Sequence, residues 1–332
     1  SRYLPLLNRK IYKFVRVNSF MYFKTKIING KKYKYVAKSI RLPDGRVRTL
    51  EKLYKGGSKI ELEKFFEERE KSEFVNYALR KYVRDHIFTR EEIEKLELIN
   101  YNYRKIIKKI SKISLRDLFD RFTANFTYES NALEGNSLTL KDVAMVMFEN
   151  IAIKGKDLRE IYETRNSRIV VEGIFRNKFS ISHKDIIKMH KILIKDTGVH
   201  EGYKNLPNII LGRNMETTPP ENVEQEMENL ILWYNKNRDK LHPLRLASRF
   251  HGIFEQIHPF EDGNGRVGRF LINVILTENK YFPLIIRRSQ RVSYLTALEK
   301  FDLKHYDTLE RFLLERFKET YRKFFEIYVK YI

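Results

Sequence analysis

The chain has 332 residues and a net charge of +22, with 65 Lys and Arg residues against 43 Asp and Glu residues. Hydrophobic residues make up 42% of it and aromatic residues 13%, which is enough for a sizeable core and excludes a disordered chain. The absence of cysteine excludes a disulfide scaffold and thiolate zinc sites. There is no run of about eighteen apolar residues and no signal-like stretch at the start. We therefore expect a soluble, cytoplasmic protein with no membrane partner.

The first 60 residues form a basic segment, with 17 Lys and Arg residues against two acidic ones. Aromatic and β-branched residues from Ile11 onward, interrupted by Asn29-Gly30 and Pro43-Asp44-Gly45, predict a three-stranded β-meander over residues 1–58. Lysines that alternate with tyrosines can contact nucleic acid, but the same alternation is typical of a sheet with one solvated face. The pattern favours the sheet and leaves a nucleic acid partner open.

Helical spacing of apolar residues dominates the chain beyond Gly57. No proline occurs between Pro43 and Pro207, which supports a helical body. Besides the helices on either side of the segments described below, helices are predicted over residues 61–84, 90–110, 158–175, 183–195, 223–233, 294–314 and 316–332.

The sequence around Ser130 and Glu134 predicts a joint between two helices. The two residues are four positions apart and therefore share one face of the first helix. Gly135 or Asn136 can end this helix in a left-handed conformation, and Asn136 or Ser137 can cap the next helix. Spacing alone assigns no function to Glu134.

A short extended segment interrupts the helices between Gly202 and Pro220. Ile209, Ile210 and Leu211 are followed by the turn-like sequence Gly212-Arg213-Asn214. A lone strand leaves backbone donors and acceptors unpaired. The segment is therefore a hairpin, a place where another chain docks, or a plain surface loop.

Residues 258–269, HPFEDGNGRVGR, combine more kinds of reactive group than any other part of the chain. Pro243 begins a helix whose apolar stripe ends at His258, and a second helix follows the glycines. A glycine-rich turn at a helix N-terminus is an anion site, because unpaired N–H groups and the helix dipole both favour negative charge. Gly263 and Gly265 let the backbone approach a phosphate closely.

Side chains in the same segment add acid, base and cation chemistry. Arg266 and Arg269 share a helix face and can clamp phosphate oxygens. Asp262 can hold Mg²⁺ through one carboxylate, with phosphate and water as the other ligands. His258 is the natural base for a hydroxyl that attacks phosphorus.

Other phosphate-binding classes do not fit these residues. Residues 263–268 satisfy G-x-G-x-x-G, but a helix precedes them and no acidic residue follows about twenty positions on, so the dinucleotide fingerprint is accidental. The kinase motifs H-R-D and D-F-G and the P-loop motif are absent.

Residues 258–269 match the Fic family motif H-x-F-x-[DE]-G-N-G-R-x-x-R at every fixed position, and the chain resembles that family over about residues 115–315. Residues 130–136 resemble its inhibitory motif [ST]-x-x-x-E-[GN], and the segment around Leu211 resembles its flap. The resemblance implies a mainly α fold, a helical bundle with a short β-hairpin flap, preceded here by the small basic β-meander. We divide the chain into the β-meander module (1–58), a helical connector (59–114), the catalytic core (115–315) and a C-terminal helix packed on the core (316–332).

The resemblance also implies protein adenylylation, in which AMP passes from ATP to a Tyr, Thr or Ser hydroxyl of a target protein and pyrophosphate is released. The target would present an extended segment to the flap. His258 would deprotonate the hydroxyl and Asp262 would ligate Mg²⁺. The other implied site residues are Gly263, Asn264, Gly265 and Arg266 for the anion hole, Arg269 for the γ-phosphate, Phe260 as the loop anchor, and Leu211, Gly212, Arg213, Asn214 and Tyr294 around the nucleotide.

The resemblance gives Ser130 and Glu134 an inhibitory role, since the family's glutamate pairs with the second motif arginine, here Arg269. Removal of AMP stays open as a reverse activity. Lys204 and Asp302 depart from the residues common in the family, which leaves the base preference open. Two alternative functions remain: a nucleic-acid-binding regulator with the core as a nucleotide sensor, and a transferase with another nucleotide donor. A homodimer stays open as the assembly.

Overall fold

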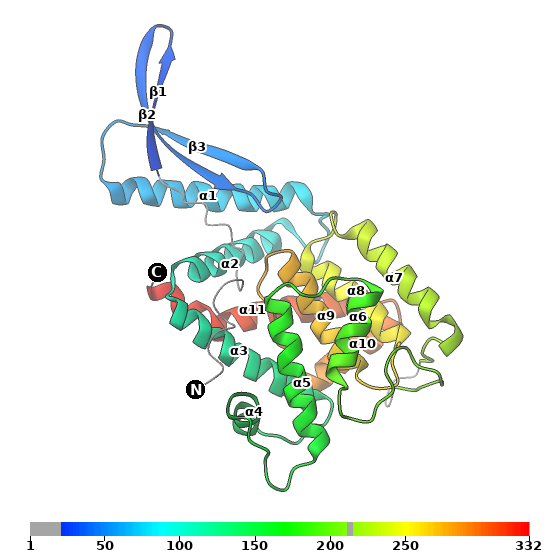
Figure 1. Cartoon of the computed structure of the whole chain (residues 1–332). Helices are drawn as coiled ribbons and strands as arrows, with labels where there is room; N and C mark the ends of the chain where they lie inside the picture. Colours follow the sequence, from blue (N-terminus) through cyan, green and yellow to red (C-terminus); the bar gives the residue numbers. More distant parts are fainter. Residues whose placement is uncertain (1–20, 211–214, 332) are drawn as a thin grey trace. The chain divides into compact units, whose positions relative to one another are not determined.

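The computed structural model describes residues 21–210 and 215–331 (Figure 1). Contacts divide the chain into two compact units, residues 1–101 and 102–332. Within the described residues, none of the helices combines the length and apolar character needed to cross a bilayer. The mainly α fold with a small antiparallel sheet is confirmed. The limits of the four predicted segments stay predictions.

The first unit contains a sheet of three antiparallel strands in the order β1 (Met21–Ile28), β2 (Lys31–Arg41) and β3 (Val47–Leu53). Asn29 and Gly30 both have positive φ, the geometry of the tight turns that match strand twist. The predicted meander is confirmed from Met21 onward, while the part expected between Ile11 and Met21 lies outside the described residues.

One face of the sheet packs on α1 (Lys59–Lys81), which begins with a capping box formed by Ser58 and Glu61. Alternate residues of β2 point towards this helix, because side chains in a strand alternate between faces. The cluster that joins sheet and helix contains Val36, Ile40, Leu42, Leu50, Leu62, Phe66 and Tyr77.

The second unit is helical and is built around the antiparallel pair α8 (Pro243–Ile257) and α9 (Asn264–Glu278), which pack on each other (Figure 1). Phe250 and Phe254 of α8 and Phe270 and Leu271 of α9 are fully buried, so the predicted apolar stripes are confirmed. The unit boundary falls within α2 (Arg90–Lys109). The other elements are α3 (Lys112–Leu133), α4 (Leu140–Ala144), the π-helical turn η1 (Met145–Glu149), α5 (Leu158–Phe175), α6 (His183–Leu193), α7 (Val223–Asn237), α10 (Arg291–Asp302), α11 (Tyr306–Phe324) and the 3-10 turns η2 (Pro220–Asn222), η3 (Arg288–Gln290) and η4 (Glu326–Tyr331).

In the joint after Glu134, the residue that caps the N-terminus of the following helix, α4, differs from the sequence prediction. Gly135 has φ +97° and follows α3 in the left-handed conformation, as predicted. However, neither Asn136 nor Ser137 caps α4. Thr139 does so, because Asp142 three positions later completes a capping box with it.

The predicted terminal helices, 294–314 and 316–332, are wrong in their division. The break lies at Leu303–His305, and α11 then runs through position 315 without interruption. Lys304 has φ +66° and its N–H donates to the Phe301 carbonyl, so a lysine takes the left-handed position that usually holds glycine. No glycine or proline marks this break in the sequence.

The extended segment before α7 forms a narrow antiparallel contact. Ile209 and Glu216 make an isolated bridge, which is the part of the predicted hairpin that the structure describes. Leu211, Gly212, Arg213 and Asn214, which the resemblance places around the nucleotide, lie outside the described residues.

Candidate active site

The loop of residues 258–263, called here the motif loop, joins α8 to α9. His258 ends α8 in the left-handed conformation with φ 50°, and its N–H still donates to the Phe254 carbonyl. Gly263, with φ +84°, occupies the N-cap of α9. Few non-glycine residues adopt the conformation of His258, and such positions gather at functional sites.

Phe260 and Asn264 fix the shape of the motif loop. Phe260 is fully buried. Its N–H donates to Asn264 Oδ1 at 2.8 Å, and Asn264 Nδ2 donates back to the Phe260 carbonyl at 2.7 Å. Asn208 Nδ2 donates to the same carbonyl at 2.8 Å. The backbone N–H and carbonyl of Phe260 are therefore both satisfied, which holds the loop to the first residue of α9.

His190 of α6 packs against the motif loop, a contact that the sequence did not predict. Its ring stacks on Phe260 with 3.8 Å between centroids, and its Nε2 lies 3.0 Å from the Asp262 carbonyl oxygen. Burial lowers the pKa of His190 to about 4. The ring is therefore neutral at physiological pH and donates its Nε2 proton to that carbonyl.

Lys204 anchors the segment 202–220 to the motif loop. Its N–H donates to the Pro259 carbonyl at 2.9 Å, and its buried Nζ donates to Asn208 Oδ1 and Thr217 Oγ1. Burial lowers the pKa of Lys204 to about 8. The Lys204 side chain thus ties together both arms of the extended segment, and its backbone N–H ties the segment to the loop that carries Asp262.

Arg269 is held in the core by α3. Its Nε donates to Ser130 Oγ at 3.0 Å and its Nη2 to the Ser130 carbonyl at 2.8 Å. Nη2 also lies 2.7 Å from Glu134 Oε1. A Cβ atom at Gly265 would collide with the Glu134 carboxylate, so glycine there leaves room for it. The structure thus brings together the two residues that the resemblance pairs.

Glu134 is charged in this position. Burial favours the neutral acid, but the charge and hydrogen bond of Arg269 outweigh it and hold the pKa of Glu134 below its usual value. The stability that this pair contributes is present above the ordinary pKa of a glutamate and is lost only as pH falls through the lowered value. The ion pair is therefore intact at neutral pH.

Asp262 lies at the mouth of the site with a 42% exposed side chain and contacts Arg159 and Arg266. Burial raises its pKa, but the charge of Arg266, the Gly263 N–H and Arg159 together hold the pKa below the usual range. Within residues 21–210 and 215–331, no group of three or more His, Cys, Asp or Glu side chains could hold a metal. A single carboxylate, here also paired with arginines, fits Mg²⁺ that is shared with nucleotide phosphates.

His258 faces a partly open space. Its side chain is 16% exposed, and its Nδ1 lies 3.8 Å from Glu255 Oε2. A cavity of about 420 Å³ adjoins the end of α8 at Ile253, Gln256 and Ile257, and residues 215–219 and Glu226 line the rest of it. His258 thus has a carboxylate nearby that can orient it, and it follows in sequence the last residue of α8 that lines the cavity, Ile257.

The side chain of Tyr294 is buried more completely than we expect of a residue that lines a nucleotide pocket. Its side chain is 3% exposed, and its hydroxyl lies 2.7 Å from His251 Nε2. The rings of Tyr294 and His251 stack. Tyr294 is thus a buried neighbour of α8 in the structure, and its contact with a nucleotide stays a prediction.

These features define a class of site: a helix–loop–helix that presents a histidine, a carboxylate, a glycine turn and two arginines. Residues 180–276 match the model of the Fic/DOC family. The resemblance to the Fic family seen in the sequence is therefore confirmed.

Relatives at the level of whole proteins extend this match. The chain is 30% identical over 178 residues to the protein adenylyltransferase Fic of Nematostella vectensis, covering 52% of this chain and 42% of that protein. It is 30% identical over 176 residues to the protein of the same name from Drosophila virilis, covering 52% and 36%. The match thus spans less than half the length of these curated relatives.

Solved structures show the same fold. A Fic domain containing signaling protein from Bacteroides thetaiotaomicron matches with a TM-score of 0.64 and 24% identity, over 71% of this chain and 95% of that chain. Fic-1 from C. elegans matches with a TM-score of 0.63 and 20% identity, over 73% of this chain and 74% of that chain.

Proposed function

We propose that the chain is a protein adenylyltransferase that transfers AMP from ATP to a hydroxyl of a target protein. The observation that carries this proposal is the motif loop, which presents His258 beside the N-terminus of α9 and its arginines. The names of the relatives support the same activity. The missing cysteines are compatible with a reducing compartment, for which the cytoplasm is our proposal.

The site residues have separate roles in this reaction. His258 takes the proton of the target hydroxyl while the hydroxyl oxygen forms a bond to the α-phosphorus. The bond from that phosphorus to the bridging oxygen breaks, and pyrophosphate leaves. The backbone N–H groups at Asn264 and Gly265 and the Arg266 guanidinium stabilise the charge on the phosphate oxygens.

Asp262 would hold Mg²⁺, which when bound would neutralise charge on the phosphates. Because the Asp262 carbonyl is fixed by His190 and the loop by Asn264, the carboxylate is presented from a rigid backbone. Such preorganisation is what catalysis by positioning requires.

Glu134 would restrain this activity. Arg269 is 3% exposed, and its Nε and Nη2 are already bonded to Ser130 and Glu134, so the Glu134 carboxylate occupies a donor that a γ-phosphate would use. The Glu134 carboxylate also lies over Gly265, where an incoming phosphate would approach α9. A nucleotide would therefore bind in an unproductive position, or Glu134 would have to move. Removal of AMP from a modified target is the reverse activity that the same site leaves open.

Mass spectrometry of modified proteins tests the donor and the reaction together. The Glu134→Gly variant, incubated with Mg²⁺, lysate and either ATP, GTP, CTP, UTP or CDP-choline, is expected to add AMP from ATP to Tyr, Thr or Ser side chains. The same variant with His258→Ala is the control and should add nothing. Addition of another group from another donor would replace the proposal with the alternative transferase.

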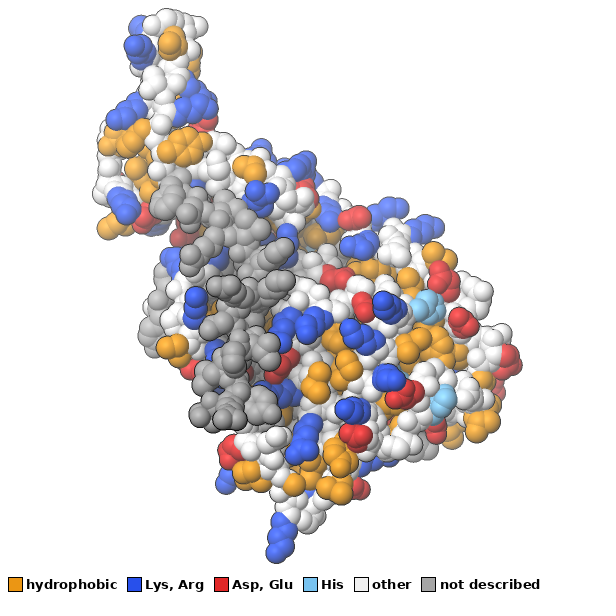
Figure 2. All heavy atoms as spheres, viewed as in Figure 1, with side chains coloured by type: hydrophobic (Ala, Val, Ile, Leu, Met, Phe, Trp, Pro, Cys, Tyr) orange, Lys and Arg blue, Asp and Glu red, His pale blue; other side chains and the backbone are white. Residues whose placement is uncertain are grey.

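The β1–β2 hairpin supports nucleic acid binding as a second candidate function. Phe23 and Ile27 are 57% and 68% exposed, and Lys34 lies 4.2 Å above the Phe23 ring. Figure 2 shows Lys and Arg side chains beside hydrophobic ones along this hairpin. Exposed aromatics among cations can stack on bases and neutralise phosphates.

A salt titration tests this second function. Replacing Lys31, Lys32 and Lys34 with Glu is expected to weaken binding to a DNA or RNA probe. The slope of log affinity against log salt should become shallower by about 0.7–0.9 for each phosphate that the variant no longer neutralises. ATP labelling should be unchanged. The pair Lys236→Glu and Lys240→Glu, near the end of α7, is the control. An unaltered slope in the hairpin variant would exclude this surface.

A further inference from the structure

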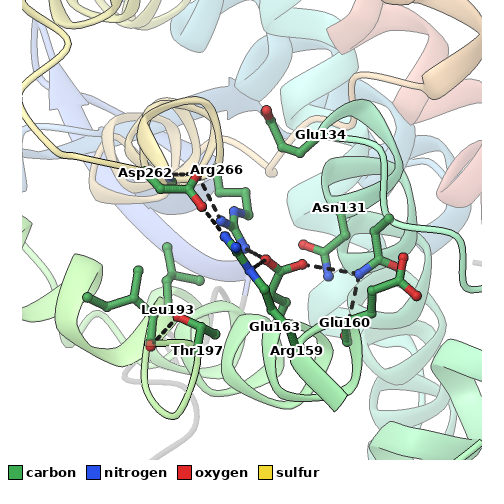
Figure 3. A network of polar contacts seen from close by, with 12 residues as sticks. Asn131, Glu134, Arg159, Glu160, Glu163, Leu193, Thr197, Asp262 and Arg266 are labelled. Atoms are coloured by element: carbon green, nitrogen blue, oxygen red, sulfur yellow. Dashed lines mark hydrogen bonds and ion pairs between the residues drawn. The ribbon is translucent and has the colours of Figure 1, made fainter. Parts of the chain in front are cut away.

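Two arginines and two carboxylates form a closed ring at the mouth of the site (Figure 3). Arg159 and Glu163 stand one turn apart on α5, and Asp262 and Arg266 belong to the motif loop and α9. Glu163 Oε1 lies 2.8 Å from Arg266 Nη1 and 3.3 Å from Arg159 Nε. Asp262 contacts Arg159 through Oδ2 and lies 3.5 Å from Arg266 Nη2 through Oδ1. Each carboxylate therefore touches both arginines.

The two arginines differ in freedom. Arg266 is 3% exposed and enclosed by the core, so its guanidinium stays in place. Arg159 is 46% exposed and extends from the first turn of α5. Its second partner, Glu163, is fixed independently by Asn136 Nδ2 at 3.3 Å. Arg159 can therefore leave Asp262 and keep an ion pair with Glu163, whereas Arg266 cannot move without disturbing the core.

This arrangement bears on any cation that Asp262 would bind. Mg²⁺ lies about 2.0–2.1 Å from its oxygen ligands. The Arg159 guanidinium contacts Oδ2 of the same carboxylate, so the two cations cannot occupy that oxygen together without strong repulsion. The other oxygen, Oδ1, accepts from the Gly263 N–H and faces Arg266. A metal on this carboxylate would therefore bind most readily at Oδ2, next to the Arg159 guanidinium.

We propose that Arg159 is a positioning residue that competes with the divalent cation for Asp262 and so sets the metal requirement of nucleotide binding. This rests on the proposed function, because the metal is expected to arrive with nucleotide phosphates. Without metal, Arg159 holds the Asp262 carboxylate in place and neutralises its charge. When metal binds, Arg159 would leave Asp262 and keep its ion pair with Glu163.

A direct role of Arg159 in holding phosphate is the competing explanation, and the two make opposite predictions. A phosphate ligand contributes to affinity with or without metal, so its loss weakens binding equally in both conditions. A competitor for Asp262 opposes the metal and shields the carboxylate in its absence. Its loss therefore strengthens binding with metal relative to binding without it.

The experiment measures the dissociation constant of ADP by isothermal titration calorimetry with saturating Mg²⁺ and with EDTA. ADP carries no γ-phosphate, so its binding does not depend on release of Arg269 from Glu134. For Arg159→Gln, the ratio of the EDTA to the Mg²⁺ dissociation constant is expected to rise about two- to fivefold, the scale of one partly exposed ion pair. Arg159→Lys should raise it less, since it keeps the charge.

Two controls separate the effect from general loss of charge. Arg168→Gln removes another arginine of α5 that pairs with a glutamate four residues on, and it should leave the ratio unchanged. In an Asp262→Asn background, Arg159→Gln should no longer change the ratio, because the shared carboxylate is gone.

The outcomes of these measurements distinguish failure of the inference from failure of the proposed function. An unchanged ratio in Arg159→Gln, or an equal loss of affinity in both conditions, would overturn it while leaving the proposed function intact. Complete absence of ADP binding by the unaltered chain would overturn the proposed function and the inference with it.

Discussion

Incorporation of AMP by the Glu134→Gly variant is expected to fall about 10²- to 10⁴-fold when His258 is also changed to Ala. His258 follows the last residue of α8, and its partly exposed imidazole comes directly after Ile257, which lines the cavity. Its loss removes the group that accepts the hydroxyl proton, but no group assigned to the phosphates. Labelling of the chain and of its targets with [α-³²P]ATP measures the effect.

ADP affinity shows whether the loss is chemical. The dissociation constant of ADP should stay within about twofold of that of the parent variant, because His258 is assigned no phosphate contact. His86→Ala, an exposed histidine of the other unit, is the matched control and should label normally. Residual labelling above one tenth would mean that another group serves as the base.

Glu134→Gly by itself is expected to raise automodification about 10- to 100-fold. The change removes a charge-assisted hydrogen bond to Arg269, for which about 1.5–3 kcal/mol is typical, and this corresponds to roughly 10- to 150-fold in an equilibrium. It also clears the space above Gly265. The measurement is the initial rate of [α-³²P]ATP incorporation at saturating Mg²⁺.

Two further variants and a pH series sharpen this second result. Glu134→Gln keeps the size of the side chain but not its charge. Its rate of incorporation should therefore lie between those of wild type and Glu134→Gly. Since the pKa of Glu134 lies below its usual value, acidification from pH 8 to pH 6 should not release wild-type activity. Barely detectable, equal labelling of wild type and Glu134→Gly would contradict the inhibitory role.

Periodicity and motif chemistry predicted most of the helical body. The stripes of α8 and α9, the glycine turn between them, and the separation of a basic meander from a helical body all follow from local residue patterns. Predictions of single elements failed where the sequence carried no signal. The break at Lys304 uses a left-handed lysine, and the cap of α4 depends on which of several polar residues completes a box with Asp142.

The sequence by itself determined the chemical groups of the site, because the motif places His258, Asp262 and both arginines within twelve consecutive residues. It also indicated Glu134 as the partner of Arg269, though only through the resemblance of residues 130–136 to a known motif. On spacing alone, the same glutamate was the end of an ordinary helix.

Only the tertiary structure decided what surrounds these groups. Arg159 meets Asp262 across 103 positions of sequence, and His190 reaches the Asp262 carbonyl across 72. Such contacts depend on how α5 and α6 pack against α9, and arginines that pair with a glutamate four residues on are common on helix surfaces. Arg159 and Arg168 look alike in the sequence, and packing alone brings one of them to Asp262, a carboxylate of the candidate active site.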